Sequence, residues 1–180
     1  MFGSEVKEIL VTEEQIRERC KELGEILTKD YSAENEEVLV VALLKGAVPF
    51  LSELIKNIKL PLELDFMDVS SYDGTESIGD IRILKDLNCS IKEKSILLVE
   101  DIIDTGRTIF EVKKMLYNKG AKNVKVVSLL DKPERRIVDI DADYVGFDIP
   151  NEFVIGFGLD YNQKYRNLPY IGVLKPEVYK

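Results

Sequence analysis

The sequence predicts an α/β fold built on a mainly parallel, twisted β-sheet with helices on its faces. Three segments rich in Val, Leu and Ile are typical of strands buried on both faces of a parallel sheet; we call them the first, second and third apolar runs, and they lie at residues 38–44, 95–99 and 124–130. Amphipathic segments between the runs are suited to helices, and alternation of strands with helices favours parallel pairing. Because ligands of such sheets bind at the carboxyl ends of the strands, functional residues are expected just after each run.

The amino-terminal third of the chain is expected to form two helices and two strands. Residues 12–28 have an amphipathic pattern and begin with a capping box, in which Thr12 precedes Gln15 by three positions. The first apolar run follows as a strand, then a helix at residues 47–58 and a second strand at 62–69. This alternation is what a parallel sheet requires.

Residues 70–80 (SSYDGTESIGD) then break all periodicity with polar, turn-forming residues. The apolar stretch at 81–84 is expected to return antiparallel to the preceding strand. The second apolar run leads into a helix at residues 106–119, which Gly120 closes. The third run completes a strand–helix–strand unit, and three short strands are expected near residues 144–147, 154–157 and 171–174.

Length and composition predict one folded unit without an extended nucleic-acid or membrane surface. The 180 residues are 45% hydrophobic, enough to bury a core, so residues 1–180 are expected to form a single domain. A net charge of −8, from 33 acidic and 25 basic residues, disfavours binding to nucleic acid or anionic membranes through Lys and Arg. The sequence has neither a signal-peptide pattern nor an apolar stretch near the roughly 18 residues of a membrane span, so a cytoplasmic location is expected.

The absence of histidine limits the chemistry that the chain can perform. It excludes Ser-His and Cys-His nucleophilic pairs, HExxH zinc sites and histidine proton shuttles. Cys20 and Cys89 have no zinc-site spacing, and both are expected to be reduced thiols. A general base must therefore be a carboxylate, Lys, Tyr or Cys.

The segment that follows the second apolar run concentrates the unusual residues. Residues 99–108 read VEDIIDTGRT, with Glu100 and Asp101 at the strand end and Asp104 after two further apolar residues. Adjacent carboxylates can accept hydrogen bonds from ribose hydroxyls, or hold Mg²⁺ directly or through water. The turn before the next helix offers backbone N–H groups and two hydroxyls to a phosphate, which glycine lets approach closely. This turn consists of Thr105, Gly106, Arg107 and Thr108.

These acids also have a purely structural interpretation. Glu100 and Asp101 would then be solvated loop residues, and Asp104 would only cap the helix that follows. An isolated acidic pair favours this interpretation. The full run of apolar, acid, acid, apolar, apolar, acid, Thr-Gly-x-Thr after a buried strand favours a binding site.

The same run resembles the ribose-pyrophosphate loop of the type I phosphoribosyltransferases. The aspartate at position 104, with Thr-Gly and a basic residue after it, is similar to the hypoxanthine-guanine branch, in its short bacterial form. The resemblance extends from about Val6 to the carboxyl terminus. It implies the type I phosphoribosyltransferase fold with a small hood and a mobile lid loop at about residues 70–80. It also implies that Glu100 and Asp101 fix the ribose hydroxyls, that residues 105–108 bind the 5′-phosphate, and that Asp104 acts on the purine N7 proton as general base.

Two further segments match the parts of the family that contact pyrophosphate. Lys45 and Gly46 stand in its pyrophosphate loop, where the resemblance implies a cis peptide before Lys45. Ser71 and Tyr72 stand in the lid, and their hydroxyls would reach pyrophosphate once the lid closes and excludes water. Asp73 departs from the family, since many bacterial relatives have glycine directly after the tyrosine.

The carboxyl-terminal part matches the segments that contact the purine and the metal. By resemblance, Lys132 meets the 6-oxo group, Phe153 stacks on the purine and the backbone of Val154 meets its edge. Asp160 would be a direct Mg²⁺ ligand, and Arg166 would hold pyrophosphate through a bidentate fork. The implied metal-binding carboxylates are Glu100, Asp101 and Asp160.

The resemblance implies a purine-salvage transferase with Mg²⁺ as its cofactor. It would convert hypoxanthine or guanine plus phosphoribosyl pyrophosphate to IMP or GMP plus pyrophosphate, as a homo-oligomer (dimer or tetramer) without nucleic-acid or membrane partners. Two alternatives remain: a regulatory protein of the same fold that binds nucleotides and RNA, and a transferase that makes phosphoribosyl pyrophosphate. The negative charge without a basic stripe disfavours the first, and the lack of a second matching domain disfavours the second.

Overall fold

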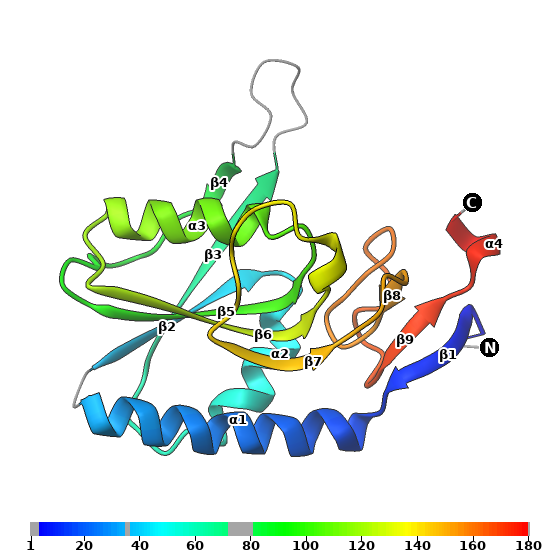
Figure 1. The fold of residues 1–180 in the computed structure, drawn as a ribbon, viewed down its shortest axis with the longest axis horizontal. Helices are drawn as coiled ribbons and strands as arrows, with labels where there is room; N and C mark the ends of the chain where they lie inside the picture. The colour runs from blue at the N-terminus through cyan, green and yellow to red at the C-terminus, as the bar shows by residue number, and fades with distance from the viewer. Residues whose placement is uncertain (1–3, 35–36, 72–80, 180) are drawn as a thin grey trace.

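A six-stranded sheet forms the centre of the computed structural model, which describes residues 4–34, 37–71 and 81–179. Its strand order is β4-β3-β2-β5-β6-β7, and all neighbouring pairs are parallel except β3 with β4 at one edge (Figure 1). The strands are β2 (Val38–Leu44), β3 (Glu63–Ser71), β4 (Ile81–Lys85), β5 (Ser95–Ile103), β6 (Asn123–Asp131) and β7 (Tyr144–Asp148). The predicted α/β fold with a mainly parallel sheet is confirmed.

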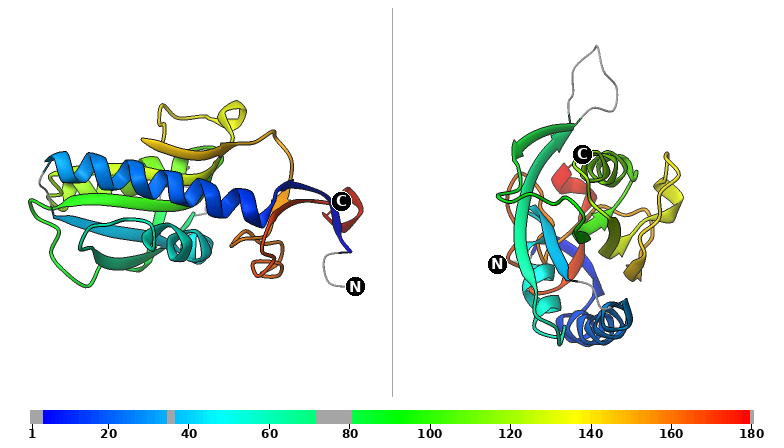
Figure 2. Two further views of the ribbon diagram at one scale, coloured as in Figure 1. Left: turned by 90° about the horizontal axis from the view of Figure 1, so that it is seen from below. Right: turned by 90° about the vertical axis from the view of Figure 1, so that its left-hand side faces the viewer.

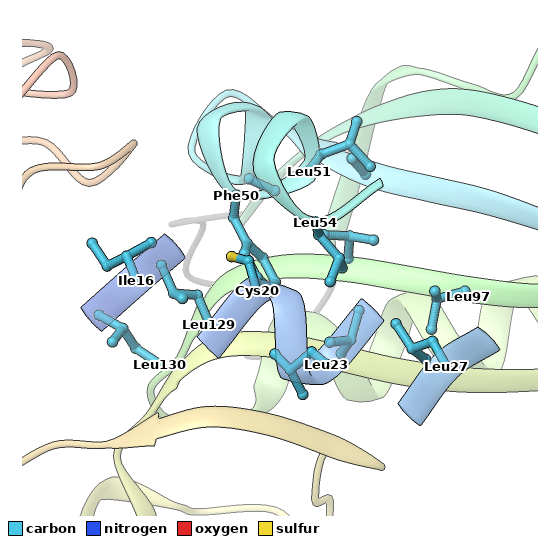
Figure 3. Close-up of a cluster of buried hydrophobic side chains, with 14 of the residues drawn as sticks. Ile16, Cys20, Leu23, Leu27, Phe50, Leu51, Leu54, Leu97, Leu129 and Leu130 are labelled. Carbon is cyan, nitrogen blue, oxygen red and sulfur yellow. The ribbon is translucent and has the colours of Figure 1, made fainter. Parts of the chain in front are cut away.

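Helices cover both faces of this sheet. α1 (Glu13–Glu34) and α2 (Ala47–Ile55) pack on one face, and α3 (Arg107–Asn118) packs on the other (Figures 1 and 2). Along β2 the side chains alternate between the two layers, so Val40 joins the first core and Val41 the second. Figure 3 shows the first core, where the helices meet β5 and β6 through Ile16, Cys20, Leu23, Phe50, Leu54, Leu97 and Leu129.

A separate three-stranded sheet lies beside one end of the central sheet, and we call it the hood (Figure 1). It pairs β1 (Val6–Val11) with β9 (Ile171–Leu174) and β9 with β8 (Val154–Ile155), all antiparallel. The short helix α4 (Pro176–Tyr179) follows it, and the two ends of the chain meet here, since the Lys175 amide donates to the Glu5 carbonyl (2.9 Å). The small hood that the resemblance implied is present.

Several predicted element boundaries are wrong for identifiable reasons. α1 continues beyond residue 28 because Tyr31, which is 2% exposed, packs in the core. β5 continues through the acidic pair to Ile103, so Glu100 and Asp101 lie on a strand and not in a loop. β8 stops at Ile155 because Gly156 turns the backbone to a φ of +99°. β1, α4 and the 3₁₀ turn at Pro133–Arg135 were not predicted.

Other local predictions are confirmed. The capping box forms at the start of α1, where the Thr12 amide donates to Gln15 Oε1 (2.9 Å) and the Gln15 amide to Thr12 Oγ1 (3.2 Å). Gly120 follows the end of α3 with a φ of +92°, and Cys20 and Cys89 are both free thiols. Within the described residues, no helix combines the length and apolarity that crossing a membrane requires.

Candidate active site

Three chain segments meet closely at the carboxyl end of the central strands. A Cβ atom on Gly46, just after β2, would lie 1.7 Å from Asp101 Oδ2 on β5. A Cβ atom on Gly158, in the loop after β8, would lie 1.9 Å from the Gly46 carbonyl oxygen. Only glycine fits at either position, and Gly158 also has a φ of +104°. The loop after β8, which we call the hood loop, therefore contacts the end of β2, and the end of β2 contacts the acidic pair of β5.

The two carboxyls of β5 are held in a setting that disfavours their charge. Burial raises the pKa of Glu100 well above its ordinary value, and the neighbouring Asp101 raises it further. Burial also raises the pKa of Asp101 to about 6, although the Ile102 amide and Arg166 oppose this shift. The Ile102 amide donates to Asp101 Oδ1 at 2.8 Å. A cation or sugar hydroxyls at this position would relieve the unfavourable burial of these charges.

The loop after β8 brings a third carboxylate, that of Asp160, and the guanidinium of Arg166 close to Asp101. Arg166 Nη2 lies 2.8 Å from Asp160 Oδ1, and Arg166 Nη1 donates to the Gly158 carbonyl (2.7 Å). Asp160 raises the pKa of Asp101 and Arg166 lowers it, so all three groups share one electrostatic environment. The peptide before Lys45 is cis, as the resemblance implied.

The turn at residues 105–108 has the form expected of a phosphate cradle. α3 begins at Arg107, after Gly106 with a φ of +83°. A cavity of about 80 Å³ opens against this helix end, and Glu100, Thr105 and Thr108 are among its lining residues. Backbone N–H groups at a helix start are suited to anions, and Arg107 is exposed beside them.

Asp104 does not cap α3, and the structural interpretation of this residue is wrong. The residue that precedes the helix is Gly106, and no side chain makes a capping hydrogen bond there. The Asp104 carboxylate instead lies between two cations, with Arg135 Nε 2.7 Å from Oδ1 and Lys132 Nζ 4.0 Å from Oδ2. Its backbone carbonyl accepts a hydrogen bond from Arg136 Nη1 (2.7 Å), which fixes the loop.

A cavity of about 380 Å³ lies in front of Asp104 and Lys132. Lys132 is only 5% exposed, and its Nζ donates to the Glu152 carbonyl at 2.7 Å. Burial lowers its pKa, and Asp104 opposes this effect. Phe153 borders the same cavity and is 38% exposed, whereas Val154, which also borders it, is 6% exposed and belongs to the core.

The structure therefore gathers the predicted residues into two neighbouring groups. One group contains Gly46, Glu100, Asp101, Asp160 and Arg166, and the other, at the cavity of about 380 Å³, contains Asp104, Lys132, Phe153 and Val154. Ser71 ends β3, and Tyr72 lies outside the described residues. Among the described residues, no three His, Cys, Asp or Glu side chains form a metal cage by themselves.

Several residues that line the cavity in front of Asp104 and Lys132 were not predicted. Ile102, Arg135, Asn151, Glu152, Leu159 and Tyr179 all border it. The one available sequence signal was Pro133 after Lys132, since proline at a helix start marks a turn that returns Arg135 toward Asp104. No sequence pattern connects Tyr179, near the carboxyl terminus, to this cavity.

We expect the unfolding free energy of the substrate-free protein, without divalent ions, to rise as the pH is lowered from 7 toward 5. Because burial raises the folded-state pKa values of Glu100 and Asp101, the folded state binds more protons than the unfolded state across this window. Each unit of upward shift is worth about 1.4 kcal/mol. Urea unfolding at a series of pH values measures the effect. The Glu100→Gln/Asp101→Asn variant should lose most of this slope, and an unchanged slope would contradict the assignment.

Comparisons with known proteins agree with this geometry. A family model described as the phosphoribosyl transferase domain matches residues 8–162. A hypoxanthine-guanine phosphoribosyltransferase of Lactococcus lactis is 60% identical over 175 residues, which cover 97% of this chain and 94% of the relative. The crystal structure of a hypoxanthine phosphoribosyltransferase from Staphylococcus aureus has a TM-score of 0.94 at 52% identity, covering 99% of this chain and 97% of that one. The chain therefore belongs to the phosphoribosyltransferase family, in its hypoxanthine-guanine branch.

Proposed function

We propose that this chain is a purine-salvage enzyme that joins hypoxanthine or guanine to phosphoribosyl pyrophosphate, forming IMP or GMP and releasing pyrophosphate. The observation that carries this proposal is the cavity in which Asp104, Lys132 and Phe153 converge beside the turn at residues 105–108. A carboxylate, a buried ammonium and an exposed aromatic ring offer a purine a proton acceptor, a donor for an oxo group and a stacking surface.

The phosphoribosyl half of the site supports transfer at the anomeric carbon. The bond from that carbon to the pyrophosphate oxygen breaks through an oxocarbenium-like state, and a bond to a purine nitrogen forms. Lys45 and the Arg166 fork would neutralise the leaving pyrophosphate. Glu100 and Asp101 would fix the ribose hydroxyls, while residues 105–108 hold the 5′-phosphate and so align the carbon with the base.

Asp104 would take the purine proton. Within the described residues, its Oδ1 atom is buried and lacks a properly aligned hydrogen-bond donor, although Arg135 Nε lies 2.7 Å away. The Asp104 side chain is 37% exposed and borders the cavity in front of Lys132, so its carboxylate would be within reach of the N7 proton of the incoming base.

The carboxylates at the end of β5 and in the hood loop fit a divalent cation. Asp160 raises the pKa of Asp101, so the two carboxylates repel each other, and a cation between them would remove that repulsion. Mg²⁺ usually takes one or two carboxylates together with substrate phosphate oxygens. When bound, it would neutralise the pyrophosphate as that group leaves. Asp160 would be its direct protein ligand, with Glu100 and Asp101 acting directly or through water.

We expect turnover of hypoxanthine and guanine to be lost after exhaustive EDTA treatment and restored by Mg²⁺. The reason is that the polyanionic leaving group otherwise faces the carboxylates of Asp101 and Asp160. The measurement is a steady-state assay with phosphoribosyl pyrophosphate and four bases, with and without chelator. Full activity in EDTA would contradict the metal requirement, and no turnover of any base would favour a regulatory protein of the same fold.

We further propose that residues 1–180 act as one domain, with a lid at about residues 70–80 that carries Ser71 and Tyr72 to the pyrophosphate. The protein would act in the cytoplasm as a homo-oligomer. The absence of a basic stripe in the sequence supports partners limited to its small phosphorylated substrates and their products.

A further inference from the structure

An aromatic ring from the carboxyl-terminal helix lies against the ring of Phe153. The Tyr179 and Phe153 ring centroids are 4.9 Å apart and their planes differ by 21°, which is a stacked arrangement. Tyr161 meets Phe153 edge-on, with centroids 5.8 Å apart and planes at 85°. Phe153 therefore stands in a cluster of three aromatic rings at the border of the purine cavity.

The helix that carries Tyr179 is fixed to the hood. Tyr161 Oη donates to the Val178 carbonyl (3.1 Å), and Val178 packs on the buried side chains of Ile155, Leu168 and Leu174. Lys175 ties the start of this segment to the amino-terminal strand, because its Nζ donates to the Ser4 carbonyl (2.7 Å). The stacking of Tyr179 on Phe153 is thus held by the surrounding structure.

The spacing of the two rings determines what Tyr179 can do for a purine. Stacked aromatic planes need roughly 3.4 Å each, so a gap of 4.9 Å between centroids leaves no room for a base between these rings. Phe153 nevertheless remains 38% exposed with Tyr179 in place. One side of the Phe153 ring is covered by tyrosine, while open ring surface remains at the cavity.

We infer that Tyr179 is a positioning residue for purine binding, which backs the Phe153 ring and holds it at the angle at which the base stacks. This inference rests on the proposed stacking of the purine on Phe153. A phenylalanine with 38% of its surface exposed would otherwise sample other rotamers, and fixing its χ angles in advance lowers the entropy cost of binding the base. The carboxyl-terminal segment would thus contribute to base affinity through Phe153.

The test compares Tyr179→Leu, which removes the ring, with Tyr179→Phe, which keeps it. Tyr179→Leu should raise the KM for hypoxanthine and guanine about two- to tenfold, the range that one aromatic pair is worth, while kcat and the KM for phosphoribosyl pyrophosphate stay near those of the parent. Tyr179→Phe should restore the parent KM. Tyr170→Leu makes the same change at another hood tyrosine that does not border the cavity, and it should leave the purine KM unchanged.

A double-mutant cycle separates this inference from the proposed function. If Tyr179 acts through Phe153, Tyr179→Leu should add nothing in a Phe153→Leu background. A raised purine KM in Phe153→Leu but not in Tyr179→Leu would overturn the inference and leave the stacking proposal intact. An unchanged KM in Phe153→Leu would overturn the stacking proposal itself, and the inference with it. A lowered KM in Tyr179→Leu would overturn the inference too, since it would mean that the ring blocks the base.

Discussion

Asp104→Asn is expected to lower kcat for hypoxanthine and guanine by about 10²- to 10⁴-fold, the range of general base catalysis. An amide keeps the shape of the side chain but cannot take the N7 proton. Steady-state kinetics with both bases measure the loss. Binding of phosphoribosyl pyrophosphate should be retained, because the residues proposed to hold it lie at 105–108 and around Asp101.

The same substitution should leave the fold nearly unchanged. Asp104 makes no capping bond to α3, and its closer cation, Arg135, is 44% exposed, so losing this ion pair costs little stability. The buried Lys132, 4.0 Å from Asp104 Oδ2, keeps its hydrogen bond to the Glu152 carbonyl. Thermal unfolding on the same preparation should therefore be close to that of the parent. Asp139→Asn makes the identical change at an exposed position and should keep full activity. A kcat within a few-fold of the parent for both bases would show that Asp104 is not the base.

Hypoxanthine and guanine are expected to exceed adenine in kcat/KM by about 10⁴-fold, as sites built around one polar contact can achieve. The reason lies in Lys132, whose Nζ already donates to the Glu152 carbonyl and has only donors left to offer. A 6-oxo group accepts such a donor, whereas the 6-amino group of adenine opposes it with donors of its own. The measurement is kcat/KM for the three bases under one set of conditions.

Lys132→Gln should narrow this preference, because a glutamine amide both donates and accepts hydrogen bonds. Lys114→Gln removes an exposed lysine of α3, whose side chain is 63% exposed, and should leave the ratio unchanged. Comparable kcat/KM values for adenine and hypoxanthine in the parent enzyme would show that Lys132 does not contact the 6-position.

The central sheet could be predicted because its signals are local in the chain. The run at Val38–Leu44 is buried on both faces, and the periodicity of α1 and its capping box are complete within one segment. The hood could not be predicted in the same way. β1 is a short strand with mostly exposed or half-buried residues, and it forms by pairing with β9, at the far end of the chain.

The same difference between local signals and long-range contacts decides which parts of the site could be predicted. The turn at residues 99–108 was predictable because a continuous motif carries its chemistry, and the structure places Asp104 in a cavity with Lys132. The continuation of β5 through Glu100 and Asp101 was missed, since charged residues rarely extend a buried strand. Arg135 and Tyr179 reach the cavity only through a turn and a sheet pairing that no single segment encodes, so neither could be predicted.

The pairing of β1 with β9 also sets an order in which the molecule can be completed during synthesis. β9 is the middle strand of the hood, so β1 and β8 have no partner in this sheet until residues 171–174 have been made. β2, β5 and α3, which carry most of the residues proposed to bind phosphate and ribose, are translated long before. A growing chain can therefore form the turn at residues 105–108 early, whereas Phe153 and Tyr179 take their places at the cavity only after β9 has completed the hood.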